Sequence, residues 1–266
     1  MTDNTLAAAQ AWARQAFACS ALKQLKFRHL RAMLPPLEGR RCLDIGGDNG
    51  VISFMLRELG GEWSSAELTE DGASAIRGVV GERVFVMPPG RPAPFADRSF
   101  DLVVVVDYLE HVADDCLVID ELARILVPGG LLVINVPHPR PGHWLERLRH
   151  RLGLTDQWHG HLRPGYDLEK LRGMLEGRFS LERHAYYHGP FSELVDTALN
   201  FMYMSRQKNK QTSAKGLVVT AEDWVRRAKE AKLLKAAHPV LKAFCALDAL
   251  APRAWRHRMV VRARRS

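Results

Sequence analysis

The chain has 266 residues, of which 47% are hydrophobic and 26% are charged. This composition is that of an ordinary globular protein, and it excludes a disordered, collagen-like or coiled-coil chain. The net charge of +8 arises late in the sequence, because residues 201–266 hold 16 of the 38 Lys and Arg but only 4 of the 30 Asp and Glu. A basic surface for nucleic acid or an anionic membrane is therefore expected only in the last quarter of the chain.

The cysteines and the N-terminal segment indicate the compartment. The four cysteines form no CxxC pair, and a chain of this size needs no disulfides to fold. No segment has the order of a signal peptide, and no apolar stretch reaches the roughly 18 residues of a membrane span. We expect a reduced, cytoplasmic protein, with peripheral attachment to the inner face of a membrane left open.

Residues 1–38 are predicted to form an N-terminal helical segment, since they are rich in helix-forming residues up to Pro35-Pro36. Strands and helices then alternate through residues 39–190, the predicted cofactor-binding core. Strands are expected at 41–45, 62–68, 84–87, 101–107, 131–136 and 179–187, and helices at 51–59, 70–80, 114–126 and 167–176. This alternation predicts an α/β fold with a mostly parallel sheet and helices on both faces, whose ligands bind at the carboxyl ends of the strands.

The remainder is predicted to be a helical insertion or lid, residues 191–252, followed by a closing strand and basic tail, residues 253–266. Apolar residues at helical spacing over 191–204 could wall a hydrophobic acceptor pocket, or could simply pack on the core. A basic helix is expected farther on, where it could rest on an anionic membrane or an acyl carrier protein, or face solvent. Its residues are Trp224, Arg226, Arg227, Lys229, Lys232, Leu233, Leu234 and Lys235.

The first predicted strand runs into a glycine-rich turn, Gly46-Gly47-Asp48-Asn49-Gly50. Glycines there would let the backbone approach a ligand closely, and Asp44 just before them can accept hydrogen bonds. A phosphate is not expected, because Asp44 and Asp48 would repel it. Glu67 ends the second strand, where a carboxylate can bind both hydroxyls of a ribose.

Five motifs in order resemble those of class I S-adenosylmethionine-dependent methyltransferases, most closely the small-molecule, domain 11-like branch. They are Leu43–Gly50, Glu67, Pro94–Val103, Asp107–Val112 and Glu121–Gly130. The resemblance implies a Rossmann-like sheet with an antiparallel closing strand, and S-adenosyl-L-methionine as the cofactor. It implies that the methionine part is held by Asp44, Gly46, Gly47, Asp48 and Gly50, and the ribose by Glu67. It also implies that Asp107, Tyr108 and Leu109 line the space near the sulfonium and the acceptor.

Two positions depart from the family pattern. Asp48 stands where the family turn usually has glycine, and Pro88 and Pro89 stand where an acidic residue often binds the adenine amine. The sequence therefore gives no residue for adenine.

A hydroxyl acceptor needs a base, a role that suits histidine. The candidates are His161, Tyr166, His111 and His138, with His161 and Tyr166 favoured because their segment normally faces the acceptor; each could instead have a purely structural role. His159-Gly160-His161 is too tight to give two facial ligands on one helix, so no metal site is expected.

These features predict O-methylation of a small hydrophobic metabolite that is similar to a polyketide, quinone or lipid. The metabolite could be free in solution, attached to a carrier or held in a membrane. One alternative is an RNA methyltransferase that uses the basic C-terminal region. Nucleic acid is not expected, however, because no RNA-binding module and no interleaving of basic and aromatic residues is found. The other alternative is a non-catalytic module that binds S-adenosylmethionine.

Overall fold

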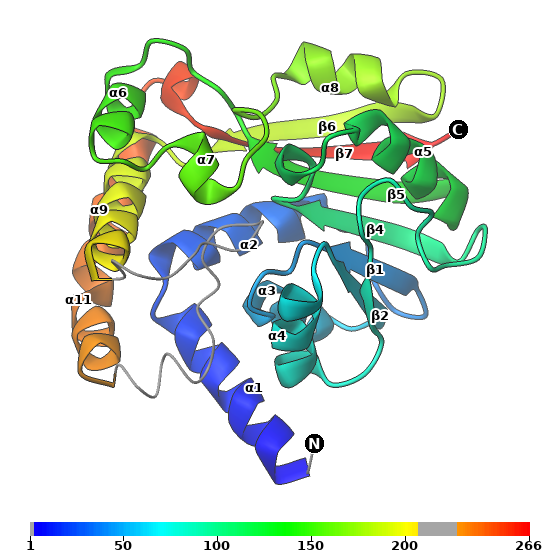
Figure 1. The fold of residues 1–266 in the computed structure, drawn as a ribbon, viewed down its shortest axis with the longest axis horizontal. Helices are drawn as coiled ribbons and strands as arrows, with labels where there is room; N and C mark the ends of the chain where they lie inside the picture. The colour runs from blue at the N-terminus through cyan, green and yellow to red at the C-terminus, as the bar shows by residue number, and fades with distance from the viewer. Residues whose placement is uncertain (1–2, 207–227) are drawn as a thin grey trace.

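The computed structural model describes residues 3–206 and 228–266. A seven-stranded sheet with the order β3-β2-β1-β4-β5-β7-β6 forms its centre (Figure 1). Strands β1 to β5 pair in parallel, whereas β7 is antiparallel to both of its neighbours, β5 and β6. The strands are β1 (Arg41–Ile45), β2 (Glu62–Glu67), β3 (Val84–Val86), β4 (Phe100–Val106), β5 (Leu126–Pro137), β6 (Phe179–Tyr187) and β7 (Arg258–Arg265).

The predicted fold class is confirmed, including the antiparallel closing strand, and β6 has the predicted bounds. The predicted start of β5 at Leu131 is wrong, because the strand already begins at Leu126, which pairs with Phe100. A shift in register between Phe100 and Leu102 takes up Pro128-Gly129-Gly130, so these residues form an irregularity within the strand rather than a break before it.

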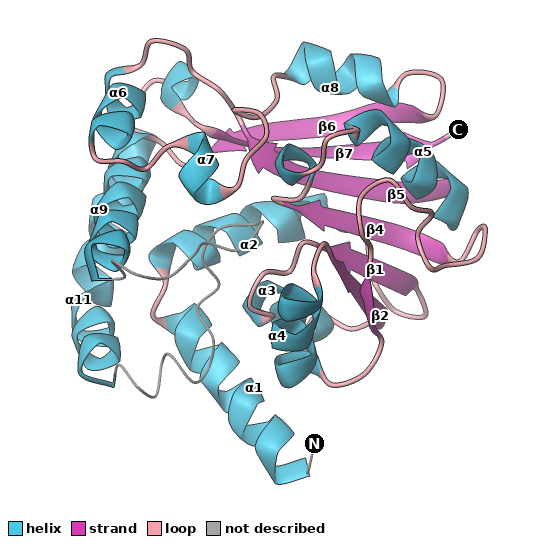
Figure 2. Cartoon of the chain, in the orientation of Figure 1, coloured by secondary structure: helices cyan, strands magenta, loops and turns pink. Residues whose placement is uncertain are grey.

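Strand β4 carries apolar side chains to both faces of the sheet, as a central parallel strand must. On one face, Val103 and Val105 pack with residues of α5 (Asp115–Ile125) and α8 (Leu168–Leu175). On the other face, Leu102, Val104 and Val106 pack with residues of α2 (Ala21–Met33) and α3 (Val51–Arg57). Helix α1 (Asp3–Ala18) lies against α3 and α4 (Glu70–Val80). The sheet, whose strands are magenta in Figure 2, is therefore the middle of three layers, with helices on both of its faces.

A second group of helices gathers at the end of the sheet toward which β1, β4 and β5 point (Figure 1). It comprises α6 (Trp144–Arg151), α7 (Asp156–His159), α9 (Pro190–Arg206) and α11 (Ala228–Ala246), with the short turns η2 (Leu247–Ala249) and η3 (Arg253–Trp255). The expected basic helix falls partly here, while Trp224, Arg226 and Arg227 lie outside the described residues. Among the helices that are described, none is long and apolar enough to cross a bilayer.

Candidate active site

The glycine-rich turn after β1 forms a cradle that other residues could not form. Gly46 has a φ of +88°, and a Cβ there would lie 2.1 Å from the Val106 carbonyl oxygen at the end of β4. Gly50 has a φ of +79°, and a Cβ there would lie 3.1 Å from Ile76 Cα. Only glycine satisfies both the left-handed backbone and these close contacts. The turn therefore packs closely against the end of β4 and against α4, and its glycines fix the backbone conformation of the cradle.

Asp44, at the end of β1, forms hydrogen bonds that hold the start of this turn. Its buried carboxylate accepts hydrogen bonds from Ser53 Oγ, from Ser65 Oγ at 2.8 Å and from Arg57 Nη1 at 3.2 Å. Burial raises the pKa of Asp44, while the Arg57 charge and the two hydroxyls oppose that rise. Asp44 therefore joins the start of the turn to α3 and β2, and its contact with the methionine part stays a prediction.

Glu67 reaches from the end of β2 back to the same turn. Its buried carboxylate accepts hydrogen bonds from the amides of Asp48, at 3.2 Å, and Leu68, at 2.7 Å. Asp48 adopts a φ of +55°, a conformation that aspartate tolerates better than most residues, which explains how it replaces the usual glycine. The cradle and the adjoining carboxylate fit S-adenosylmethionine, with the methionine part at the turn and the ribose at Glu67.

Asp107 follows β4 in a left-handed conformation, with φ at +44°. Its carboxylate accepts hydrogen bonds from Asn135 Nδ2 at 2.9 Å and Arg258 Nη1 at 2.8 Å, and it forms an ion pair with Lys26. These partners come from β5, β7 and α2. Asp107 therefore joins three distant segments at the carboxyl edge of the sheet.

The two residues after Asp107 are packed rather than exposed. Tyr108 and Leu109 are both buried, and the Tyr108 hydroxyl donates a hydrogen bond to the Met87 carbonyl at 2.9 Å. Burial, with a smaller contribution from the Glu67 charge, raises the pKa of Tyr108. Tyr108 thus fastens the end of β4 to the segment after β3, where adenine is expected.

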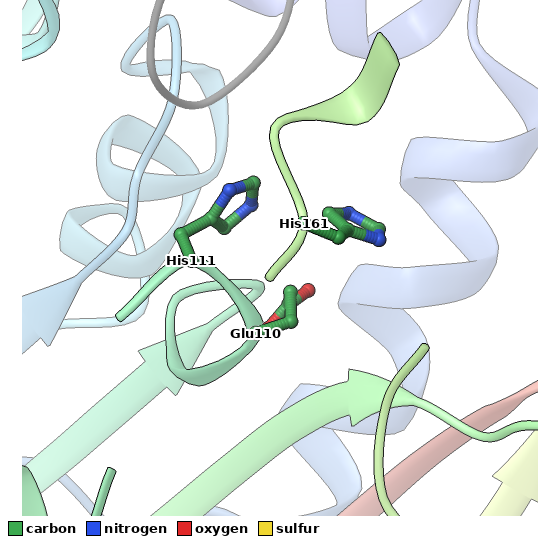
Figure 3. A group of neighbouring side chains, drawn as sticks. All are labelled: Glu110, His111 and His161. Carbon is green, nitrogen blue, oxygen red and sulfur yellow. The ribbon is translucent and has the colours of Figure 1, made fainter. Parts of the chain in front are cut away.

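Glu110, His111 and His161 form a cluster beside this turn (Figure 3). Glu110 and His111 belong to η1 (Leu109–His111), and His161 lies on the loop after α7. The centroids of the imidazole rings of His111 and His161 are 4.9 Å apart. The Glu110 side chain is fully buried, and burial, with the nearby Asp107 charge, raises its pKa.

Tyr166 lies in the core. Its hydroxyl oxygen lies 2.8 Å from Asp115 Oδ2 and 3.0 Å from the Leu109 carbonyl oxygen, so its one hydrogen has two acceptors within reach, and burial raises its pKa. A phenol with these bonds holds the loop against the turn after β4, and it is poorly suited to be a catalytic base.

The comparisons with known proteins agree with this architecture. A family model described as a methyltransferase domain matches residues 13–178, more than half of the chain. The chain belongs to the class I S-adenosylmethionine-dependent methyltransferases.

One relative is UbiE of Cellvibrio japonicus (strain Ueda107), named a ubiquinone/menaquinone biosynthesis C-methyltransferase. It is 31% identical over 111 residues, which cover 38% of this chain and 45% of that protein. The match thus spans less than half of the relative's length.

Two solved structures share the fold. An S-adenosylmethionine dependent methyltransferase from Mesorhizobium loti has a TM-score of 0.53 and 19% identity, over 92% of this chain and 98% of that chain. Phosphoethanolamine N-methyltransferase 2 of Haemonchus contortus, in complex with S-adenosyl-L-methionine, has a TM-score of 0.54 and 16% identity, over 91% and 52%.

The methyltransferase has a pocket beyond the end of β5, with about 590 Å³ of space that is partly open to solvent. Histidines and arginines dominate its lining: His138, His150, His159, His161 and His257, with Arg140, Arg149 and Arg258. Helix α9 contributes Glu193 to this lining. The sequence left open whether the apolar residues of 191–204 wall a pocket or pack on the core, and none of those that are described lines this pocket.

The histidines of this pocket are held in different ways. His138 Nδ1 lies 3.1 Å from the Tyr166 carbonyl oxygen, a bond that places its proton on Nδ1. Arg149 donates to His159 Nε2 at 3.0 Å, and burial, reinforced by the Arg149 charge, lowers the pKa of His159 to about 2. His257 is buried, and its pKa is lowered by burial and by the positive groups around it. These contacts hold His159 and His257 neutral near pH 7.

The sequence pattern did not indicate Lys26, Glu110 and Arg258. In the sequence, Lys26 fits a helix surface, Glu110 fits a helix start, and Arg258 fits a basic tail. Only the position of Glu110 within the motif after β4 could have indicated it, whereas the other two lie far along the chain from Asp107, their partner.

Proposed function

We propose that this methyltransferase transfers the methyl group of S-adenosylmethionine to an oxygen atom of a small acceptor bound in the pocket beyond β5. The observation that carries the proposal is His138, which lines this pocket with its Nδ1 proton directed to the Tyr166 carbonyl. That bond leaves the basic lone pair on Nε2, as an acceptor hydroxyl requires.

Each part of the site has a simple task in this reaction. Bound S-adenosylmethionine supplies a methyl group on a positively charged sulfur. Gly46, Gly47 and Glu67 hold the donor, and His138 takes the proton of the acceptor hydroxyl as its oxygen becomes nucleophilic. Correct placement of the two reactants accounts for most of the acceleration, because the methyl group is already activated.

The lining of the pocket indicates the class of acceptor. Pro137, Pro139, Leu154 and Pro164 give apolar contacts, and the histidines and arginines give hydrogen-bond donors between them. A flat apolar body with several oxygen substituents suits such a surface, as in quinol-like or polyketide-like compounds. A lipid with a long unbroken chain suits it less well.

The test measures release of S-adenosylhomocysteine from His138→Gln with candidate acceptors. We expect kcat to fall by about 10²- to 10⁴-fold, the usual contribution of a general base, with affinity for S-adenosylmethionine unchanged. His184→Gln, an exposed position on β6, is the matched control and should keep full activity. Full activity of His138→Gln would contradict the assignment of the base.

C-methylation is a second candidate, supported by the similarity to UbiE, which is named a C-methyltransferase. Methyl transfer from a ¹³C-labelled donor separates the two, because the carbon chemical shift distinguishes a methoxy group from a methyl on carbon. Binding of the donor without any transfer would instead support the non-catalytic module.

A further inference from the structure

The cluster of Glu110, His111 and His161 is held together by the backbone. Leu162 donates its amide hydrogen to the Glu110 carbonyl oxygen at 2.8 Å, and the Gly160 carbonyl lies 3.0 Å from His111 Nδ1. These two contacts bracket His161 on the loop. One potential ligand atom from each of the three side chains lies within 4.8 Å of the others (Figure 3). The arrangement therefore brings together residues fifty positions apart in the sequence.

Glu110 is the residue whose surroundings are incomplete. Its side chain is fully buried, and neither carboxylate oxygen has a hydrogen-bond partner among the described residues. Leaving a buried polar group unsatisfied costs about 1–3 kcal/mol, and more for a charged one. By contrast, the buried carboxylates of Asp44 and Glu67 both accept hydrogen bonds from protein groups. A bound cation would supply what Glu110 lacks.

The histidines show the outer contacts of metal ligands. His111 Nδ1 faces the Gly160 carbonyl, and His161 Nδ1 lies 3.8 Å from Asp156 Oδ1. A histidine that binds a metal through one ring nitrogen commonly directs the other to a carbonyl or carboxylate, which fixes the tautomer and the ring. The contact of His111 directs its Nδ1 hydrogen to the carbonyl and leaves a lone pair on Nε2, while Asp156 lies near enough to His161 Nδ1 to orient that ring.

We propose that Glu110, His111 and His161 bind one divalent transition-metal ion at the wall of the acceptor pocket. Two imidazoles and one carboxylate favour ions such as Zn²⁺, Mn²⁺ or Fe²⁺ over Mg²⁺ or Ca²⁺, which prefer oxygen ligands. Three protein ligands leave coordination positions open, and His161 itself lines the pocket. An acceptor oxygen can occupy such a position, where the ion would lower the pKa of its hydroxyl. This role in transfer rests on the proposed function, whereas ion binding does not.

The experiment titrates the chelator-treated full chain with Co²⁺ in the absence of S-adenosylmethionine, following visible absorption and metal content after dialysis. We expect one ion per chain and nitrogen–oxygen coordination. Glu110→Gln and His161→Ala should each weaken binding by more than about 100-fold, because loss of a residue that only orients a ligand already costs about 10- to 100-fold. Circular dichroism and melting temperature show whether each variant is folded. If Glu110→Gln does not fold, His161→Ala, on the loop after α7, still tests the site.

One control variant and a parallel measurement of methyl transfer make the result decisive. Asp114, Asp115 and Cys116 form another group of potential ligands, so Cys116→Ser should leave Co²⁺ binding unchanged. Loss of binding in Cys116→Ser, or retention in both cluster variants, would overturn the proposal. Absence of binding in a chain that still transfers methyl groups would overturn it and leave the proposed function intact. Co²⁺ binding without any transfer would contradict only the proposed function.

Discussion

The two halves of the site are built on different principles. The cofactor half consists of a backbone turn and one carboxylate, and its parts lie between Asp44 and Glu67 along the chain. The proposed acceptor half is the pocket lined by side chains from β5, β7, α6, α7 and α9 and from the loops between them. Backbone geometry tolerates few substitutions, whereas a pocket of side chains can change one residue at a time. Under the proposed function, the choice of acceptor can therefore change without a change to the donor site.

The comparison predicts the largest effect for a side chain added to the turn. In Gly46→Ala the new Cβ meets the Val106 carbonyl oxygen at 2.1 Å in a left-handed conformation. We expect affinity for S-adenosylmethionine to fall by about 30-fold or more, because backbone strain costs about 1–2 kcal/mol and the clash about 1–3 more. Isothermal titration calorimetry measures the affinity.

Gly60→Ala is the matched control, since Gly60 has a φ of +93° but nothing lies within 4 Å of its Cβ position. It should lower the melting temperature slightly and leave donor binding unchanged. Equal effects of the two substitutions on donor affinity would show that the left-handed backbone, rather than close packing against Val106, explains the glycine.

Glu67→Gln should give the next largest effect and should sharpen the separation of the two halves. Loss of charged hydrogen bonds costs about 1.5–3 kcal/mol, so donor affinity should fall about 10- to 100-fold. The acceptor KM, measured at saturating donor, should not change. A higher acceptor KM with unchanged donor affinity would contradict the assignment of Glu67 to the donor site.

Asp107→Asn tests the junction between the halves. It removes the ion pairs with Lys26 and Arg258 at positions about four-fifths buried, and we expect unfolding to become easier by about 2 kcal/mol. Asp101→Asn, at the other end of β4, breaks a more exposed pair with Arg41 and should cost less than about 1 kcal/mol. Urea denaturation measures both, and equal costs would contradict a special role for the Asp107 junction.

The smallest effect concerns acid stability. The folded-state pKa of His257 lies well below its ordinary value, because the ring is buried beside His188, Arg258, Arg140 and Arg149, with Glu193 as the opposing charge. The unfolded chain takes up a proton at His257 as the pH falls below about 6.5, whereas the folded chain does not. Stability is therefore lost on the acid side of that value.

In His257→Gln this contribution is absent, so the fall in melting temperature between pH 7.5 and pH 5.5 should be smaller than in the unmodified protein. His184→Gln should leave the fall unchanged. An identical pH dependence for His257→Gln would mean that His257 is protonated in the folded protein.

The features that could be predicted from the sequence are those that depend on residues close together along the chain. The alternation of apolar runs located β4 and β6, and the glycines located the cradle, since these features depend on neighbours along the chain. The sequence did not predict that Glu110 meets His161, or that Lys26 and Arg258 meet at Asp107. Such pairs depend on the packing of distant elements, and a single lysine or glutamate has the same local pattern in solvent as in a site.

The position of β7 has a consequence for how the protein is made. Strand β7 is the last strand along the chain, yet it lies between β5 and β6. Until it has been synthesised, β5 and β6 expose unpaired edges that can pair with other chains. Arg258, which begins β7, also reaches Asp107 only then. A chain that ends before β7 therefore leaves edges that can pair with other chains and lacks the contact between Arg258 and Asp107.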